Sequence, residues 1–332
     1  MAFVVDGSEW CFDGWSEAEI DSALGAFLER VTTAQSRGER VWIGDDIYTR
    51  PVLGGLSVWE LLSPGAAVKL DNEILEKLAA ALGRATRYLD EESWPVGMEY
   101  PEIVVGEGPA SENADVYWAH HRVRAGRAVA CLALRRSGVY LTGSAAGAVK
   151  LHWVIDERGH RAFFRSAIDV ERDTAATLER LAPHAYPDTF FLPGVWRGLS
   201  DFEGGYTRVR EELRRYLDGF DDHGWWVFMA PSPLETELDR RPPIEGRPDQ
   251  RLIERRFSLC GLEMAPENAN VAQHKTCRQA RERTLKGRTL YCQWHGKIEP
   301  HINRIHIHPP IPESGNRIVV AIFHAHLPLP GD

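Results

Sequence analysis

The sequence predicts an α+β fold in two parts, a large acidic region rich in tryptophan followed by a small C-terminal domain built on an antiparallel sheet. Three observations support this prediction. Helical and strand-like hydrophobic patterns mix along the first 230 residues. Residues 231–250 contain five prolines and almost no apolar periodicity, which is typical of a linker. Three short strand-like segments follow near the C-terminus. We therefore expect domains at 1–230 and 251–332, joined by a linker at 231–250.

The composition is that of an ordinary globular protein, with 43% hydrophobic and 26% charged residues in 332. The five cysteines include no closely spaced pair, which argues against a disulfide framework or a zinc ribbon and favours a reducing compartment. No apolar run approaches the roughly 18 residues that a membrane span needs. We expect a cytoplasmic protein with no membrane partner.

The formal charge of −9 is distributed unevenly along the chain. Residues 251–332 contain 12 Lys plus Arg against 7 Asp plus Glu, a balance of +5, so residues 1–250 carry −14. The basic segment also contains seven of the 13 histidines. The average charge argues against a nucleic-acid partner, but a basic C-terminal domain is compatible with one.

The first expected element is a helix that begins near Ser16, where Ser16 and Glu19 form a capping box and apolar residues repeat at helical spacing as far as Val31. Gly38 ends it. A second helix is expected over 71–90, with short strands between the two, and a third over 115–125.

From 128 to 229 the pattern predicts strands and then helices. Residues 128–134 (AVACLAL) form the first strand, and residues 149–156 and 160–168 form a hairpin through Glu157, Arg158 and Gly159. The glycine-rich segment 142–148 lacks the ending of a P-loop, so we expect a turn between strands. Helices are expected near 170–182 and 206–218, and a buried strand at 225–229 (WWVFM).

Three strands are expected near the C-terminus, at 290–298, 304–308 and 317–323. Side chains alternate between the two faces of a strand. Leu290, Cys292, Trp294 and Ile298 therefore face the core, as do Ile305 and Ile307. A short turn at 299–302 predicts an antiparallel hairpin. In the expected register the numbers of two directly opposite residues add up to 601. That register pairs Lys297 with Arg304, His295 with His306, and Gln293 with His308. The third strand is apolar on both faces, as in a central strand.

Like charges placed opposite each other destabilise a sheet, so this polar face favours an anionic ligand. RNA is one such ligand. Imidazoles on this face would act as general base and acid on a ribose 2′-hydroxyl and a leaving 5′-oxygen. The lysine and arginine side chains would stabilise the charge that develops on the phosphoryl group. This chemistry needs no cofactor.

Two alternatives remain open. In one, the sheet is a non-enzymatic platform that binds a partner. In the other, His-x-His pairs on neighbouring strands bind a transition metal, since residues two apart on a strand share a face. The ligands would be His295, His306, His308 and His324. Against a metal, Lys297 and Arg304 would lie beside the ion, and these strands offer no carboxylate.

The motifs WHGKI and R-I-H, with a last strand that runs into His-Leu, resemble the small bacterial RelE/ParE-like toxins. The resemblance spans about residues 271–329 and is strongest to the YafQ-type mRNA interferases. It implies a basic antiparallel sheet that carries a ribonuclease site. His326, followed by Leu327, would be a general acid or base, with His295 and His306 as partners in proton transfer. The implied phosphate-binding residues are Lys297, Arg304 and Arg317.

The same resemblance implies a biological role. Its members belong to toxin–antitoxin systems, so the expected function is that of an RNA-binding, RNA-cleaving toxin-like protein in a toxin–antitoxin or phage-defence setting. A protein partner would then be an antitoxin or a subunit of a defence complex. Nothing in residues 1–250 resembles a known family.

Overall fold

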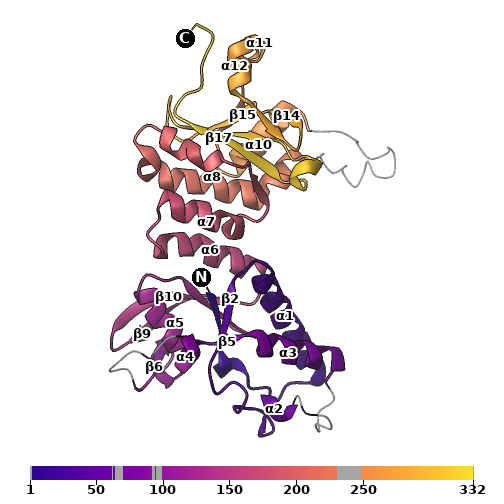
Figure 1. Ribbon diagram of the computed structural model, residues 1–332, viewed down its shortest axis with the longest axis vertical. Coiled ribbons are helices and arrows are strands. Elements are labelled where there is room, and N and C mark those ends of the chain that lie inside the picture. The colour runs from indigo at the N-terminus through magenta and orange to yellow at the C-terminus, as the bar shows by residue number, and fades with distance from the viewer. Residues whose placement is uncertain are drawn as a thin grey trace. The chain divides into compact units, whose positions relative to one another are not determined.

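The computed structural model describes residues 2–61, 63, 70–91, 94, 99–229 and 248–331. It divides the chain into two compact units, Met1–Arg172 (unit 1) and Asp173–Asp332 (unit 2). The predicted α+β class is confirmed, because each unit combines helices with a sheet (Figure 1). In the part of the chain that is described, no helix is long and apolar enough to cross a membrane.

The units divide at 172/173, which is not where the sequence predicted a boundary. Most of the expected linker, 231–250, lies outside the described residues, and its last residue begins helix α10 (Gln250–Leu259). Elements on both sides of it pack together: strand β11 (Thr189–Phe191) pairs with β17 (Ile318–His324), and α8 (Gly205–Phe228) contacts α10. Proline-rich composition indicates irregular chain but does not tell whether that chain separates two domains or lies within one.

Unit 1 is built on an eight-stranded sheet in the order β5-β2-β1-β8-β10-β9-β6-β7. The first five strands are parallel, and the rest are antiparallel to their neighbours. In sequence order the strands are β1 (Ala2–Val5), β2 (Arg40–Ile43), β5 (Thr86–Arg87), β6 (Glu102–Val105), β7 (Ser111–Glu112), β8 (Val129–Leu132), β9 (Gly138–Ser144) and β10 (Gly147–Val154).

Parallel neighbours need long crossover connections, and helices supply them here. The helices of unit 1 are α1 (Glu17–Ser36), α2 (Val58–Leu61), α3 (Asn72–Arg84), α4 (Tyr88–Glu91), α5 (Ala114–Arg124) and α6 (Glu157–Val170). Smaller pieces are η1 (Gly7–Glu9) and the hairpin of β3 (Pro51–Leu53) with β4 (Leu56–Ser57). The predicted helix at Ser16 is confirmed together with its capping box, and α5 confirms the third helix. The second helix is shorter than predicted and ends at Arg84.

The predicted hairpin between 149–156 and 160–168 is wrong, because residues 157–170 form helix α6. Asp156 caps this helix by accepting the Gly159 N–H at 2.7 Å. Phe163, Phe164 and Ala167 are buried at helical spacing on one face. Strand β10 instead pairs with β9 through residues 145–146, so the turn expected at 142–148 is confirmed.

Unit 2 is built on a five-stranded sheet in the order β11-β17-β16-β15-β12. Only the β11–β17 pair is parallel, so the predicted antiparallel C-terminal sheet is confirmed. The remaining strands are β12 (Met264–Pro266), β13 (Glu282–Leu285), β14 (Arg288–Tyr291), β15 (Trp294–Lys297) and β16 (Arg304–His308). The helical segments are α7 (Ala175–Ala185), η2 (Val195–Asp201), α8, α10, α11 (Ala269–Gln273), α12 (Lys275–Ala280) and η3 (Pro312–Ser314). Helix α8 contacts β17 (Figure 1).

The predicted register of the C-terminal hairpin is confirmed for two pairs, Lys297 with Arg304 and His295 with His306. Gln293 is not among the paired residues, because the single strand expected at 290–298 is split into β14 and β15. Strand β17 is buried on both faces over 318–323, as predicted.

The strand predicted at 225–229 is also wrong, because these residues end helix α8. Gly224 and Val227 are buried, whereas Trp225 is 63% exposed. The run of aromatic residues therefore spans both faces of a helix and does not indicate a buried strand.

Candidate functional site

The structure brings together two of the predicted site residues, His295 and His306. They lie opposite each other on β15 and β16, with ring centroids 5.5 Å apart. Their exposed fractions are only 7% and 1%. The sequence analysis placed them on the polar face of the hairpin as a site for an anionic ligand, and the structure buries both side chains.

The other predicted residues have partners elsewhere. Lys297 forms an ion pair with Glu263 at 3.0 Å, and Arg317 donates to the carbonyl oxygens of Ser314 and Pro187. The backbone N–H of His326 donates to Nδ1 of His324 at 3.0 Å. In a further contact, His308 Nδ1 lies 2.8 Å from the carbonyl oxygen of Pro309. Arg304 pairs across the sheet with both Lys297 and His324.

Two residues that the sequence analysis missed complete the cluster around the histidines. Glu267 directly follows β12, and Arg281 directly follows α12. Arg281 Nε donates to Glu267 Oε1 at 2.6 Å, and the two side chains are 1% and 4% exposed. The short strand β12 pairs with β15, where Ala265 is opposite His295, and this pairing positions Glu267.

Three side chains of types that can bind a metal ion lie close together. The ligand atoms of Glu267, His295 and His306 all lie within 4.8 Å of one another. Glu267 Oε1 is 3.6 Å from His295 Nδ1 and 3.9 Å from His306 Nδ1. Among the described residues, no other group of three or more His, Cys, Asp or Glu side chains is arranged in this way.

Two imidazole nitrogens in the cluster lack a hydrogen-bond partner in the described structure, Nδ1 of His295 and Nε2 of His306. Nδ1 of His306 lies 3.3 Å from the carbonyl oxygen of Cys292. That contact favours the tautomer with hydrogen on Nδ1, because a carbonyl accepts. The lone pair on Nε2 of His306 is then available to a ligand.

Burial controls the charge of both imidazoles. It lowers the pKa of His295 to about 4, although the Glu267 carboxylate opposes this change. Burial also holds the pKa of His306 well below its ordinary value, and His295 and Arg281 add to the effect. Both rings are therefore neutral near pH 7, which is the form that binds a metal ion.

Comparisons of the chain with protein-family models, with curated proteins and with solved structures gave no match. The resemblance to the RelE/ParE-like toxins therefore stays a prediction from the sequence motifs.

The cluster offers two neutral imidazoles and one carboxylate. Three protein ligands of these types are typical of metal sites that keep a further position for water or a substrate. The carboxylate was not predicted from the sequence, because the predicted ligands all lie on the three C-terminal strands. Glu267 instead directly follows β12, a strand of only three residues.

Proposed function

We propose that unit 2 binds a divalent transition-metal ion through Glu267, His295 and His306. The observation that carries this proposal is the convergence of two buried imidazoles and a carboxylate, whose ligand atoms lie within 4.8 Å of one another. Each imidazole also has one buried nitrogen without a hydrogen-bond partner in the described structure. A buried polar atom left without a partner costs about 1–3 kcal/mol. A metal ion would accept both lone pairs.

The ligand set favours ions such as Zn²⁺ or Fe²⁺, which bind imidazole and carboxylate together. Metal–ligand distances of about 2.1 Å in tetrahedral geometry place ligand atoms about 3.4 Å apart. The observed separations of up to 4.8 Å therefore require movements of about 1 Å to close around an ion. Side-chain rotation of His295 and His306 would supply them, because Arg281 holds Glu267.

Arg281 would act as an outer partner of the site. Its ion pair fixes the orientation of Glu267, as hydrogen bonds to metal-binding carboxylates commonly do. Its positive charge also lies close to the proposed ion and weakens binding. We therefore expect an affinity for the ion below that of a closed structural zinc site. Binding should occur above about pH 5, where both imidazoles are neutral.

RNA binding and metal-independent RNA cleavage, with a toxin-like or phage-defence role, stay a prediction from the sequence. Cleavage in that form requires His295 and His306 to exchange protons with a ribose and a phosphate. Both side chains are buried, and burial lowers both pKa values. A general acid or base works best with a pKa near the working pH, so these features favour the metal site.

The test measures metal content and spectra of the full-length protein after chelator treatment and reloading with Co²⁺ or Zn²⁺. We expect about one ion per chain, visible Co²⁺ absorption bands and thermal stabilisation by the ion. His295→Ala and His306→Ala should lose all three. The control is His223→Ala, which changes an exposed histidine on α8. Wild-type protein that binds no ion, or variants that bind as the wild type does, would overturn the proposal.

Glu267→Gln alone leaves Arg281 buried without its ion pair and could unfold unit 2. The double variant Glu267→Gln, Arg281→Met removes both charges, which is often nearly neutral for stability. It should fold and lose the ion. In a separate arm, single-stranded RNA is incubated with the protein in excess EDTA. Cleavage there that is lost in His295→Ala would instead establish the metal-independent ribonuclease.

A further inference from the structure

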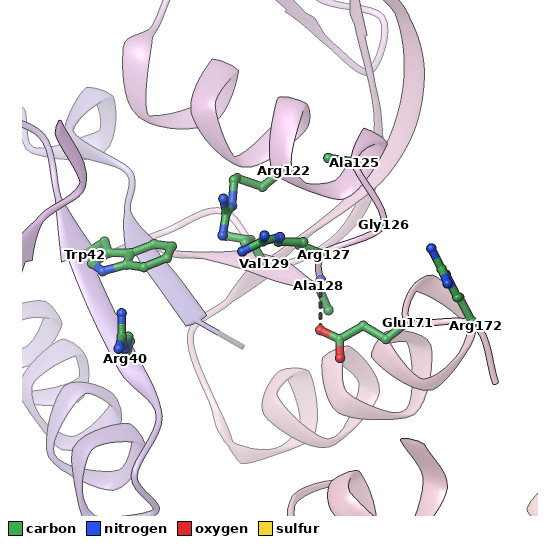
Figure 2. Close-up of a pocket in the computed structure, with 10 residues that line it drawn as sticks. All are labelled: Arg40, Trp42, Arg122, Ala125, Gly126, Arg127, Ala128, Val129, Glu171 and Arg172. Carbon is green, nitrogen blue, oxygen red and sulfur yellow. Dashed lines mark hydrogen bonds between the residues drawn. The ribbon is translucent and has the colours of Figure 1, made fainter. Parts of the chain in front are cut away.

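A pocket of about 770 Å³ lies in unit 1 at the amino ends of β2 and β8 (Figure 2). Arg40 and Trp42 belong to β2, Arg122 lies in the last turn of α5, and Arg127 lies in the turn after it. Glu171 and Arg172 follow α6. Figure 2 shows Arg122 and Arg127 extending toward the side of the pocket where Trp42 lies. We term this site the arginine pocket.

Four arginines and one glutamate line the pocket. The glutamate is engaged by the backbone, because Glu171 Oε1 accepts the Ala128 N–H at 3.2 Å. Arg40 forms an ion pair with Glu91 at 2.6 Å. Among the described residues, the guanidinium groups of Arg127 and Arg172 form neither a hydrogen bond nor an ion pair.

The negative ends of two helices neutralise part of this positive charge but not all of it. Helices α5 and α6 both end beside the pocket, and each helix C-terminus carries about −0.5 charge. Together with Glu171, and with the Glu91 carboxylate that pairs with Arg40, they supply about −3. Four guanidinium groups exceed that by about one charge, and the guanidinium groups of Arg127 and Arg172 are without a carboxylate partner among the described residues.

We propose that the arginine pocket binds a compound that carries two or more linked phosphate groups. Guanidinium groups bind phosphate through paired hydrogen bonds and stay charged at any physiological pH. The volume is within the range of small-ligand sites. The pocket is concave and bordered by strand ends and helix ends, which suits a compact anion better than a nucleic-acid backbone.

The phosphate chain would be the recognised group. Trp42 is only 4% exposed, and its ring already packs against Trp118 at 4.5 Å between centroids and beneath the Arg122 guanidinium. It leaves little ring surface for a base to stack on, so a nucleoside attached to the phosphates would project outward. Sheets of this type usually bind ligands at the carboxyl ends of their parallel strands. The arginine pocket lies at the opposite edge of the sheet, so the fold alone does not explain why four arginines gather there.

Calorimetric titration of the full-length, chelator-treated protein with inorganic pyrophosphate and tripolyphosphate tests the proposal. Chelator treatment removes metal–phosphate complexes from the measurement, so the outcome is independent of the metal site. We expect binding that weakens as salt rises, because the contacts are exposed ion pairs. Arg127→Gln combined with Arg172→Gln should weaken tripolyphosphate binding at least tenfold.

The matched control is Arg158→Gln, an exposed arginine at the beginning of α6, about 20 Å along the helix from its end. It should leave binding unchanged. Melting temperatures of all variants check that they fold. Each arginine variant is also measured singly, in case the double variant unfolds.

Four results would overturn the proposal. The first is no detectable binding of either phosphate compound. The second is equal affinity in the wild type and the folded variants. The third is sulfate binding as tight as that of tripolyphosphate, which indicates a site for a single anion. The fourth is single-stranded RNA binding that depends on Arg127 and Arg172 but does not compete with tripolyphosphate.

Discussion

Arg281 is 1% exposed and contacts three separate segments of unit 2. Its guanidinium donates to the Glu267 carboxylate and to the carbonyl oxygens of Cys277 and Pro328. Every direction from which water would hydrate this charge is occupied by protein. A single buried side chain therefore links the loop after β12, helix α12 and the C-terminal segment.

Replacing Arg281 with Met should destabilise unit 2 by about 3–5 kcal/mol, because the Glu267 carboxylate is left buried without its partner. Urea unfolding followed by tryptophan fluorescence measures the loss. The control is Arg278→Met, which breaks a half-exposed ion pair with Glu282 on the same segment and should cost about 1 kcal/mol or less. Equal losses in the two variants would show that the buried pair contributes no more than the exposed one.

Asp115 is a second buried charge, in unit 1 at the beginning of α5. It accepts the Gly7 N–H at 2.9 Å and the Tyr88 hydroxyl at 3.3 Å. Burial raises its pKa from the ordinary 3.8 to about 7; the Gly7 hydrogen bond opposes this, and the neighbouring Asp6 adds to it. The folded protein thus keeps a proton that the unfolded chain releases in weak acid.

Between about pH 4 and pH 7 the folded state therefore binds more protons at Asp115 than the unfolded state does. The contribution to stability is complete below pH 3.8 and is lost as the pH rises through about 7. Asp115→Asn should make the free energy of unfolding of unit 1 less dependent on pH, by up to about 1.4 kcal/mol per pH unit. Chemical denaturation at several pH values measures this slope. Asp90→Asn, an exposed control on α4, should leave it unchanged, and an unchanged slope in Asp115→Asn would contradict the prediction.

At the scale of single elements, β15 depends on the absence of a side chain at Gly296. A Cβ atom there would overlap the Tyr216 ring and lie 2.7 Å from Met264 Sδ. Tyr216 is itself fixed, because its hydroxyl lies 2.9 Å from the carbonyl oxygen of Glu263 and 3.0 Å from that of Lys297 and shares its one hydrogen between them. Helix α8 thus packs directly on the strand that carries His295.

Gly296→Ala should destabilise unit 2 by about 1–3 kcal/mol, the usual cost of overpacking a core. It should also weaken metal binding, since His295 is the adjacent residue. Gly25→Ala is the matched control: Gly25 lies within α1 with open space around it, and alanine there should stabilise unit 1 by up to about 1 kcal/mol. Thermal melting should show a lower melting temperature for Gly296→Ala and a higher one for Gly25→Ala than for the wild type.

Some elements could be predicted from local patterns alone. The capping box at Ser16 and the period of the following apolar residues specify α1 without any distant contact. The short turn at 299–302, together with the requirement that the polar faces of the two strands coincide, was enough to place His295 opposite His306. Local patterns failed where one sequence suits two structures. Phe163 and Phe164 fit either a strand or a helix, and the helix is the one that Asp156 caps. Glu267 could not be found, because only the pairing of β12 with β15 brings it to the histidines.

At the scale of the whole molecule, the charge split found in the sequence does not coincide with the structural units. Unit 2 contains 21 Lys plus Arg against 22 Asp plus Glu, and unit 1 contains 18 against 26. The net charges are −1 and −8. The basic C-terminal segment is therefore balanced within its own unit, for example where Lys297 pairs with Glu263 and Arg208 with Glu299. The hypothesis that a strongly basic C-terminal domain binds RNA by releasing counterions therefore loses its main support.

The same division predicts which fragments fold. Residues 173–332 should form a cooperatively folded fragment, because they include β11, α8 and the rest of the sheet. Residues 251–332 should not, because without β11 the buried strand β17 becomes an edge, and without α8 Phe257 loses its contact with Phe220. Circular dichroism and urea unfolding of the two fragments measure this. Cooperative unfolding of 251–332 would contradict the boundary at 172/173.

Arg281 hydrogen-bonds both to the carbonyl oxygen of Pro328 and to the Glu267 carboxylate, so it connects the C-terminal segment to a proposed metal ligand. The C-terminal segment would then help to hold the proposed ion without contributing a ligand, and we call this segment the latch. Its release would free Arg281 to move, and Glu267 would be held less firmly. Deleting residues 328–332 should leave the ion's ligands in place and still speed its transfer to a chelator in stopped-flow measurements. An unchanged rate of transfer would show that Glu267 is held without the latch.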